Sequence, residues 1–352
     1  MTDAKKIVLG VLAWTTVVSG LHMKLNVDWS VVINDRLPEN QRKINIAFIP
    51  VTCHLTCPVT DYITRFTKTG NLFLPKMFQG FPEIKEALIA NKIQAAFMVA
   101  PMAIALAAQG VPVRTVYLGH RYGSGFVVRK DGPIKTFPDI RGKIVAIPSR
   151  FSDERLIVFR VMKKFGVKVG EFKMVEMAPP DVAGALAAKA IDAFSMGEPF
   201  PSQAEMGGFG RVLFHAREHW PDYMSCVVVV RQDLIDKRPD AVQALVDGIA
   251  RSGLWLDSGR PNREHAADFV GRFYYNQNPA LLRWALTNPL DRVTYTPLTP
   301  YKKDFDLVRD LMIETGVLDK RIEFDEYIDT RFAEGARGMS PWNYVPGSGQ
   351  AN

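Results

Sequence analysis

A short run near the start of the chain concentrates side chains that could bind a ligand: Thr52, Cys53, His54, Thr56 and Cys57. Hydroxyl and imidazole groups can contact a small solute, and thiolate and imidazole are also soft metal ligands. The order Cys-His-x-x-Cys is not a haem-attachment motif, because no histidine follows the second cysteine. It also lacks the second ligand pair of Cys-x-x-Cys zinc sites. We therefore expect solute contact here. The alternatives are structural thiols, a tight Cys53–Cys57 disulfide, or a metal site at Cys53, His54 and Cys57.

Two further acidic positions could face a ligand. Ser152 has the side chain of a helix N-cap, and Asp153 and Glu154 would stabilise the first helical turn that follows it. Two carboxylates at that helix end would repel a bare anion seeking the same N–H groups. Glu198 follows a short apolar strand, so it either contacts solute or caps the next helix.

The sequence carries none of the common catalytic motifs. It has no Gly-x-Ser-x-Gly, no phosphate-binding Gly-x-x-x-x-Gly-Lys-Ser/Thr, no His-Glu-x-x-His and no glycine-rich dinucleotide fingerprint. His215 and His219 are four residues apart, but the second begins a His-Trp-Pro turn, so a metal pair is not expected. We predict a binding protein without a cofactor, and not an enzyme.

The elements that position these residues alternate between strand and helix patterns. Apolar strands are expected at 44–49, 95–99, 113–118, 125–129, 143–147, 172–177, 193–196, 211–214 and 226–230. Helical patterns separate several of them and dominate after residue 240. This alternation predicts an α/β fold with largely parallel sheets. A length of 352 residues suits two lobes.

The N-terminus predicts export. Lys5 and Lys6 precede an apolar stretch at 7–23, which fits a secretory signal or a short membrane anchor. The basic residues would keep the N-terminus in the cytoplasm, so we favour an anchor in the cytoplasmic membrane and a periplasmic body. The net charge of +7 favours acidic partners, but no run of five or six basic residues is present, and we do not expect nucleic-acid binding.

Five segments, which occur in the same order as in the family, resemble the nitrate/sulfonate/taurine/bicarbonate family of periplasmic solute-binding proteins of ABC transporters. They are Ile46–Thr52, Ala96–Met102, Phe137–Pro148, Met196–Phe200 and Lys237–Ala241. The resemblance implies a two-lobed clamshell with the type II periplasmic-binding fold and solute bound between the lobes. The expected organisation is a signal or anchor at 1–24, a polar linker at 25–43, lobe 1 at 44–132, lobe 2 at 133–225, and a return to lobe 1 with a helical region at 226–352.

The resemblance also suggests ligand positions and limits the ligand. Phe81 stands where the family carries a tryptophan near the ligand, and Ser124 lies in a stretch where the family contacts ligand. Glu154 replaces a histidine of nitrate- and bicarbonate-type members, and Tyr223 stands where nitrate members carry lysine. These departures favour a larger, partly apolar or neutral solute over nitrate or bicarbonate. The predicted ligand contacts are Thr52, His54, Thr56, Phe81, Pro101, Ser124, Ser152, Glu154, Glu198 and Tyr223.

Two functions fit this sequence. The first is extracytoplasmic binding of a small solute for delivery to an ABC permease. The alternative is a membrane-anchored accessory or structural subunit of a larger membrane complex that reuses the same fold. The short apolar segment and the missing anion-binding residues motivate the alternative.

Overall fold

The computed structural model describes residues 3–27, 29–67, 70 and 72–346. The chain divides into two compact units, Met1–Lys43 and Ile44–Asn352. The candidate site lies entirely within the second unit.

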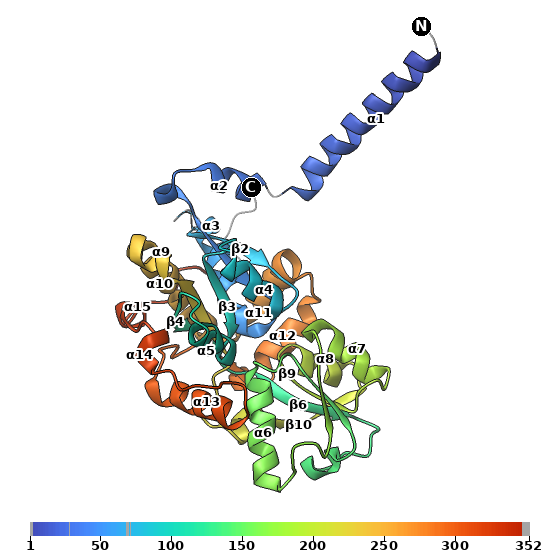
Figure 1. Ribbon diagram of the computed structural model, residues 1–352, viewed down its shortest axis with the longest axis vertical. Coiled ribbons are helices and arrows are strands. Elements are labelled where there is room, and N and C mark those ends of the chain that lie inside the picture. Colours follow the sequence, from blue (N-terminus) through green and yellow to red (C-terminus); the bar gives the residue numbers. More distant parts are fainter. Residues whose placement is uncertain (1–2, 28, 68–69, 71, 347–352) are drawn as a thin grey trace. The chain divides into compact units, whose positions relative to one another are not determined.

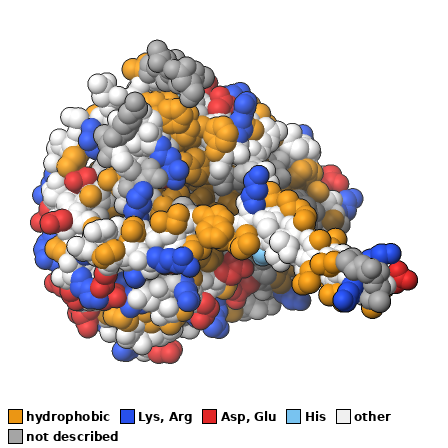
Figure 2. Space-filling view, turned by 90° about the horizontal axis from the view of Figure 1, so that it is seen from above, with side chains coloured by type: hydrophobic (Ala, Val, Ile, Leu, Met, Phe, Trp, Pro, Cys, Tyr) orange, Lys and Arg blue, Asp and Glu red, His pale blue; other side chains and the backbone are white. Residues whose placement is uncertain are grey.

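The first unit contains α1 (Asp3–Asn26), α2 (Trp29–Arg36) and a 3-10 turn at Glu39–Gln41. Over its 24 residues α1 is about 36 Å long, enough for a hydrocarbon core of about 30 Å. Its apolar side chains are exposed (Figure 2). Within the described ranges it is the single helix long and apolar enough to span a membrane. The stretch predicted as a polar linker is largely helical, and Asn34 exchanges two hydrogen bonds with the backbone of Lys43.

The second unit is built on two five-stranded mixed sheets with the same plan. The first sheet has the order β2-β1-β3-β11-β4. Its strands are β1 (Ile44–Phe48), β2 (Phe73–Met77), β3 (Ala95–Val99), β4 (Val113–Leu118) and β11 (Cys226–Arg231). β1 runs parallel to β2 and β3, whereas β11 runs antiparallel to both neighbours. The four consecutive valines of β11 are buried on both faces, as suits a central strand.

The second sheet has the order β10-β6-β9-β7-β8. Its strands are β6 (Ser124–Arg129), β7 (Ile144–Ile147), β8 (Lys173–Glu176), β9 (Ala193–Gly197) and β10 (Gly210–His215). Here β7 runs parallel to β8 and β9, and β6 is the antiparallel strand. We call the parts built on the first and second sheets lobe 1 and lobe 2. The predicted α/β class with two lobes is confirmed (Figure 1).

The chain crosses between the sheets twice. It leaves the first sheet at Leu118 and enters the second at Ser124, and it returns between His215 and Cys226. In the first crossing, the short strand β5 (Arg121–Tyr122) pairs with β12 (Val293–Thr294). The predicted change of lobe at 132/133 is therefore too late, because β6 already pairs with β9. The Gly-Pro turn at 132–133 marks a break in the chain, but a turn does not determine which sheet the preceding strand joins.

Helices cover both sheets, and the C-terminal ones also bridge the lobes. The helices that follow the strands are α3 (Thr56–Phe66), α4 (Phe81–Ile89), α5 (Ala100–Ala108), α6 (Asp153–Phe165), α7 (Val182–Ala187) and α8 (Phe200–Met206). After β11 come α9 (Gln232–Lys237), α10 (Pro239–Asp257), α11 (Arg260–Val270), α12 (Pro279–Thr287), α13 (Lys302–Glu314), α14 (Phe324–Tyr327) and α15 (Arg331–Gly335). α10 packs on α3 of lobe 1, whereas α12 and α13 also contact α8 and α6 of lobe 2 (Figure 1).

A close approach of α10 to the segment that carries Tyr295 gives a test of this packing. A Cβ placed on Gly253 would lie 2.5 Å from the backbone oxygen of Tyr295. We expect Gly253→Ala to lower the free energy of unfolding by about 1–3 kcal/mol, despite the better helix propensity of alanine. Gly184 in α7 has nothing within 4 Å of such an atom, so Gly184→Ala should be neutral or stabilising by up to about 1 kcal/mol. Urea denaturation of both variants checks this, and equal stabilities would contradict it.

Candidate functional site

The predicted ligand positions gather at the facing edges of the two sheets for a topological reason. The parallel strands β1, β3, β7 and β9 end just before Thr52, Pro101, Ser152 and Glu198, respectively. The antiparallel strands β6 and β11 begin at this same edge, which brings in Ser124 and Tyr223. Carboxyl ends of parallel strands are where ligands bind in open α/β sheets.

The loop after β1 is held by tyrosines from the C-terminal half of the chain. Proline stops the strand, and the 3-10 turn Thr52–His54 leads into α3. The Tyr275 hydroxyl donates a hydrogen bond to the carbonyl oxygen of Val51, and the Tyr295 hydroxyl donates one to that of Thr52, each 2.8 Å long. All four residues are buried, so these bonds fix the loop before any ligand binds.

Thr52 and Glu198 join the two lobes directly. The backbone N–H and the hydroxyl of Thr52 both donate to the carbonyl oxygen of Glu198, at 2.9 and 3.1 Å. The Glu198 carboxylate is used elsewhere: Arg292 lies 2.7 Å from one oxygen, and the N–H of Ser202 donates to the other at 3.1 Å. Burial raises the pKa of this carboxyl, and the Arg292 guanidinium acts in the opposite direction. The Glu198 carboxylate thus accepts a hydrogen bond from the first turn of α8 and pairs with Arg292, so both of its oxygens have partners. The Glu198 backbone carbonyl bonds to Thr52 of lobe 1.

The first turn of α6 carries two buried acidic side chains, Asp153 and Glu154. Ser152 caps the helix by accepting a hydrogen bond from the N–H of Arg155 at 3.2 Å. Ser124 donates to one oxygen of Glu154 at 3.0 Å and accepts from the Tyr223 hydroxyl at 3.1 Å. The other oxygen of Glu154 and both oxygens of Asp153 have no hydrogen-bond partner in the described part of the chain. Buried polar atoms without partners are uncommon in native structures and point to a missing partner.

Burial controls the protonation of these acids. It raises the pKa of Asp153 well above its usual value, and the neighbouring Glu154 adds to the shift. Burial likewise raises the pKa of Glu154, although backbone groups and the Ser124 hydroxyl counteract it. Two neighbouring buried acids can accept hydrogen bonds, and can donate them when they are protonated.

His54 is a neutral hydrogen-bond donor in this setting. Its Nδ1 accepts a hydrogen bond from the N–H of Ile49 at 2.8 Å, so the proton of the neutral ring resides on Nε2. Burial holds the pKa of the ring well below its usual value. Nε2 has no partner among the residues that the structure describes. The rings of Phe81 and Phe97, with centroids 6.0 and 5.3 Å away, form apolar walls around it.

The remaining predicted contacts lie at helix starts in lobe 1. Thr56 begins α3, and its buried hydroxyl oxygen accepts no hydrogen bond and donates none within the described ranges. Pro101 lies in the first turn of α5 and is buried. The role of Thr56 and Pro101 in binding stays a prediction.

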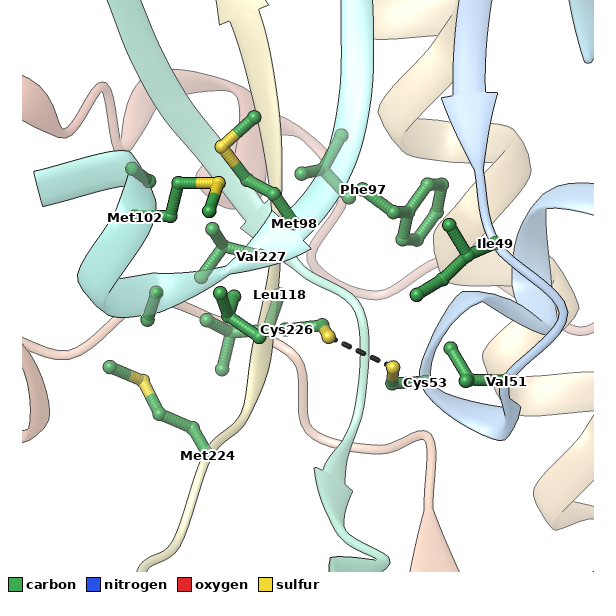
Figure 3. Close-up of a cluster of buried hydrophobic side chains, with 14 of the residues drawn as sticks. Ile49, Val51, Cys53, Phe97, Met98, Met102, Leu118, Met224, Cys226 and Val227 are labelled. Carbon is green, nitrogen blue, oxygen red and sulfur yellow. Dashed lines mark hydrogen bonds between the residues drawn. The ribbon is translucent and has the colours of Figure 1, made fainter. Parts of the chain in front are cut away.

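The sulfur neighbour of Cys53 is not Cys57, the partner in the disulfide that the sequence left open. Cys53 lies 2.9 Å, sulfur to sulfur, from Cys226 at the start of β11, and not beside Cys57 (Figure 3). The ligating atoms of Cys53, His54 and Cys226 lie within 4.8 Å of one another. A metal fits this set poorly, because His54 would have to give up either its Nε2 proton or its bond from Ile49.

Besides Phe97, which lies on the predicted strand at 95–99, five residues of the site lay outside the predicted contacts: Asp153, Cys226, Tyr275, Arg292 and Tyr295. Asp153 adjoins Glu154, and its place in the first turn of α6 was the available signal. The start of the valine-rich strand was a comparable signal for Cys226. The other three come from helical or irregular segments far along the chain, and no local pattern marks them.

Together the two sheets, the two crossings and the facing strand ends define a periplasmic-binding-protein fold. A model of the NMT1-like family matches residues 37–271, and the chain therefore belongs to that family. The predicted resemblance is confirmed.

Characterised binding proteins resemble this chain in sequence and in structure. The Escherichia coli taurine-binding periplasmic protein is 26% identical over 192 residues, covering 51% of this chain and 59% of that protein. This chain spans 21–59% of the length of the first curated relatives it matches. Two solved structures share the fold. A zinc-bound ligand-binding component of an ABC-type import system from Staphylococcus aureus has a TM-score of 0.74 at 22% identity, covering 83% of this chain and 98% of that one. The periplasmic nitrate-binding protein NrtA from Synechocystis has 0.72 at 17%, covering 83% and 87%.

Proposed function

We propose that this chain binds a small organic solute between its lobes and delivers it to an ABC permease. The observation that carries the proposal is a set of buried polar atoms without partners in the described residues, at the facing edges of the sheets: both oxygens of Asp153, one of Glu154, and Nε2 of His54. A solute that formed hydrogen bonds with these atoms would satisfy them. Solute-binding relatives in the same family support the proposal.

The chemistry of the site narrows the solute class. The acids of lobe 2 can accept hydrogen bonds, or donate them when protonated, and His54 in lobe 1 donates one. Phe81 and Phe97 supply apolar surface. A neutral or cationic solute with nitrogen donors and a flat apolar part, such as an aminopyrimidine or an aryl amine, matches these groups.

A thermal-shift screen of the full chain in detergent tests the proposal. The panel includes amines, aminopyrimidines, aromatic acids, sulfonates, nitrate and bicarbonate. A solute at 100 times its Kd adds about 2.7 kcal/mol, or several degrees in Tm. We expect a shift with nitrogen-donor solutes and none with nitrate or bicarbonate. If no solute of the panel shifts the Tm of the folded protein, the result would count against solute binding.

Binding is proposed in preference to catalysis because neither Cys53 nor Cys226 has the lowered pKa of a catalytic nucleophile. One enzyme, the desulfurization enzyme DszB, shares the fold with a TM-score of 0.61 at 14% identity. A nucleophilic cysteine needs a lowered pKa. Burial instead raises the pKa of Cys53, and raises that of Cys226 well above its usual value.

The apolar helix α1 supports attachment of the exported body to the cytoplasmic membrane, either lasting or until cleavage. It also favours the second candidate, an anchored accessory subunit of a larger membrane complex. Detergent extraction followed by affinity purification distinguishes the two. A binding protein should separate readily from its permease, whereas a structural subunit should co-purify in fixed ratio. The intact mass of the purified protein shows whether α1 is retained.

A further inference from the structure

Two cysteines far apart in sequence meet in lobe 1, where the loop after β1 contacts the start of β11. Cys53 and Cys226 are 173 residues apart, yet their sulfur atoms are separated by 2.9 Å. Figure 3 shows the two side chains pointing toward each other from the loop after β1 and the start of β11, among apolar side chains. Both are buried. A disulfide has a length of about 2.05 Å, so the sulfurs need to approach by roughly 0.9 Å.

We propose that Cys53 and Cys226 form a reversible disulfide that fixes the ligand loop of lobe 1 to the second crossing between the lobes. Cys53 follows Thr52, which bonds to lobe 2 through Glu198. Cys226 ends the second crossing, and its carbonyl oxygen accepts a hydrogen bond at 2.7 Å from the N–H of Gly119 in the first crossing. The bond would thus tie together the ligand loop and both crossings.

The disulfide would stiffen the cleft edge without locking the clamshell. Both cysteines belong to lobe 1, so the covalent link does not join the lobes. Lobe 2 can still move away from Thr52 when its hydrogen bonds to Glu198 break. What changes is the freedom of the loop that carries Thr52 and His54, and hence the preorganisation of the lobe-1 half of the site.

The chemistry balances with a small-molecule disulfide as the oxidant. One cysteine thiolate attacks that disulfide, forms a mixed disulfide and releases one thiol. The second cysteine thiolate then attacks the protein sulfur of the mixed disulfide, forms the Cys53–Cys226 bond and releases the second thiol. The two protons of the cysteine thiols pass to the departing thiolates, and the oxidant takes up the two electrons.

We expect the rate of disulfide formation to depend on the state of the lobes, because both thiols are buried. Burial raises the pKa of Cys53, and the carboxyl groups of Glu154 and Asp153 in lobe 2 act in the same direction. The reaction should therefore be slow while the lobes are closed and faster when they separate. A solute that holds the lobes closed should slow it further.

The three cysteines of the chain provide matched controls. Cys57 is also buried, but it has no sulfur neighbour among the described residues. We expect the reduced full chain in detergent, incubated with oxidised glutathione, to lose two hydrogens and then to alkylate at one cysteine after denaturation. Peptide mapping should join Cys53 to Cys226. The oxidised protein should melt roughly 5 °C or more above the reduced form, because the link closes a long loop.

Variants make the outcome decisive. Cys57→Ser should form the same link, whereas Cys53→Ser and Cys226→Ser should form none and instead retain glutathione on the remaining thiol of the pair. Two alkylated cysteines after oxidation of a folded Cys57→Ser control, or a Cys53–Cys57 link in the wild type, would overturn the proposal. So would one equivalent of a soft metal in the purified protein that disappears in both other variants and protects the thiols from oxidation.

Discussion

Arg292→Ala is expected to lower the free energy of unfolding by about 3–5 kcal/mol at pH 7–8. The Arg292 side chain is 8% exposed and the Glu198 side chain 1%, and their charged atoms are 2.7 Å apart. The same guanidinium nitrogen lies 3.0 Å from the Ser202 hydroxyl. Removing Arg292 leaves a carboxylate of lobe 2 buried without its counter-charge, and this costs more than the pair itself contributes.

The pH dependence of the stability of Arg292→Ala shows whether the unpaired Glu198 carboxylate causes the loss. Without Arg292, burial is opposed only by the hydrogen bonds from Ser202, and it raises the folded-state pKa of Glu198 further above the unfolded value of about 4.3. The folded variant then holds a proton that the unfolded chain releases as the pH rises. Its stability therefore falls with rising pH above about 4.3, and the deficit relative to wild type should shrink in acid. Urea denaturation at pH 5 and pH 8 measures this difference.

Two further variants separate charge burial from simple loss of packing. Glu198→Gln combined with Arg292→Ala should recover part of the stability at pH 8, because no unpaired charge remains. Arg217→Ala removes a surface pair with Asp291, whose side chain is 68% exposed, and should cost less than about 1 kcal/mol. If Arg292→Ala costs no more than Arg217→Ala, or if the double variant shows no recovery, the Arg292–Glu198 ion pair does not have the stabilising role proposed for it.

The sequence predicted the site as far as local patterns and strand order could. Strand–helix alternation and the capping pattern at Ser152 placed α6, and the acids of its first turn, beyond a strand of lobe 2. Thr52 and His54 were placed after the first strand in the same way. These predictions depend on residues that are neighbours in sequence, where periodicity and caps carry the information.

What the sequence could not supply is the pairing of distant side chains. Glu198 was equally suited to a cap or to a ligand contact, and its partner Arg292 lies 94 residues away. Cys53 has Cys57 four residues along the chain, yet its neighbour in space is Cys226. Tertiary packing decides such choices, and a single sequence contains no pattern that reports it. The boundary of lobe 2 failed for the same reason, since β6 joins its sheet through strands that come later in the chain.

Replacing Asp153 by asparagine should stabilise the solute-free protein and weaken solute binding. We expect Asp153→Asn to raise the free energy of unfolding of the solute-free protein by at least about 1 kcal/mol at pH 8, because it removes an ionisable group buried without a partner in the described residues. The same variant should weaken binding of a nitrogen-donor solute by roughly 10–100-fold, the value of a hydrogen bond to a charged group. A structural role alone predicts no such opposition.

The sign of the pH dependence follows from the raised pKa of Asp153. Between the unfolded value of about 3.9 and the higher folded value, the folded protein binds more protons than the unfolded chain, so stability falls as the pH rises. Asp153→Asn removes that fall. Its advantage over wild type should be absent near pH 4 and grow toward pH 8, whereas Asp319→Asn, at an exposed acid, should show no change. Urea denaturation across this range and titration with the solute found in the screen measure both effects. A variant that is less stable at pH 8, or that binds as the wild type does, would remove Asp153 from the site.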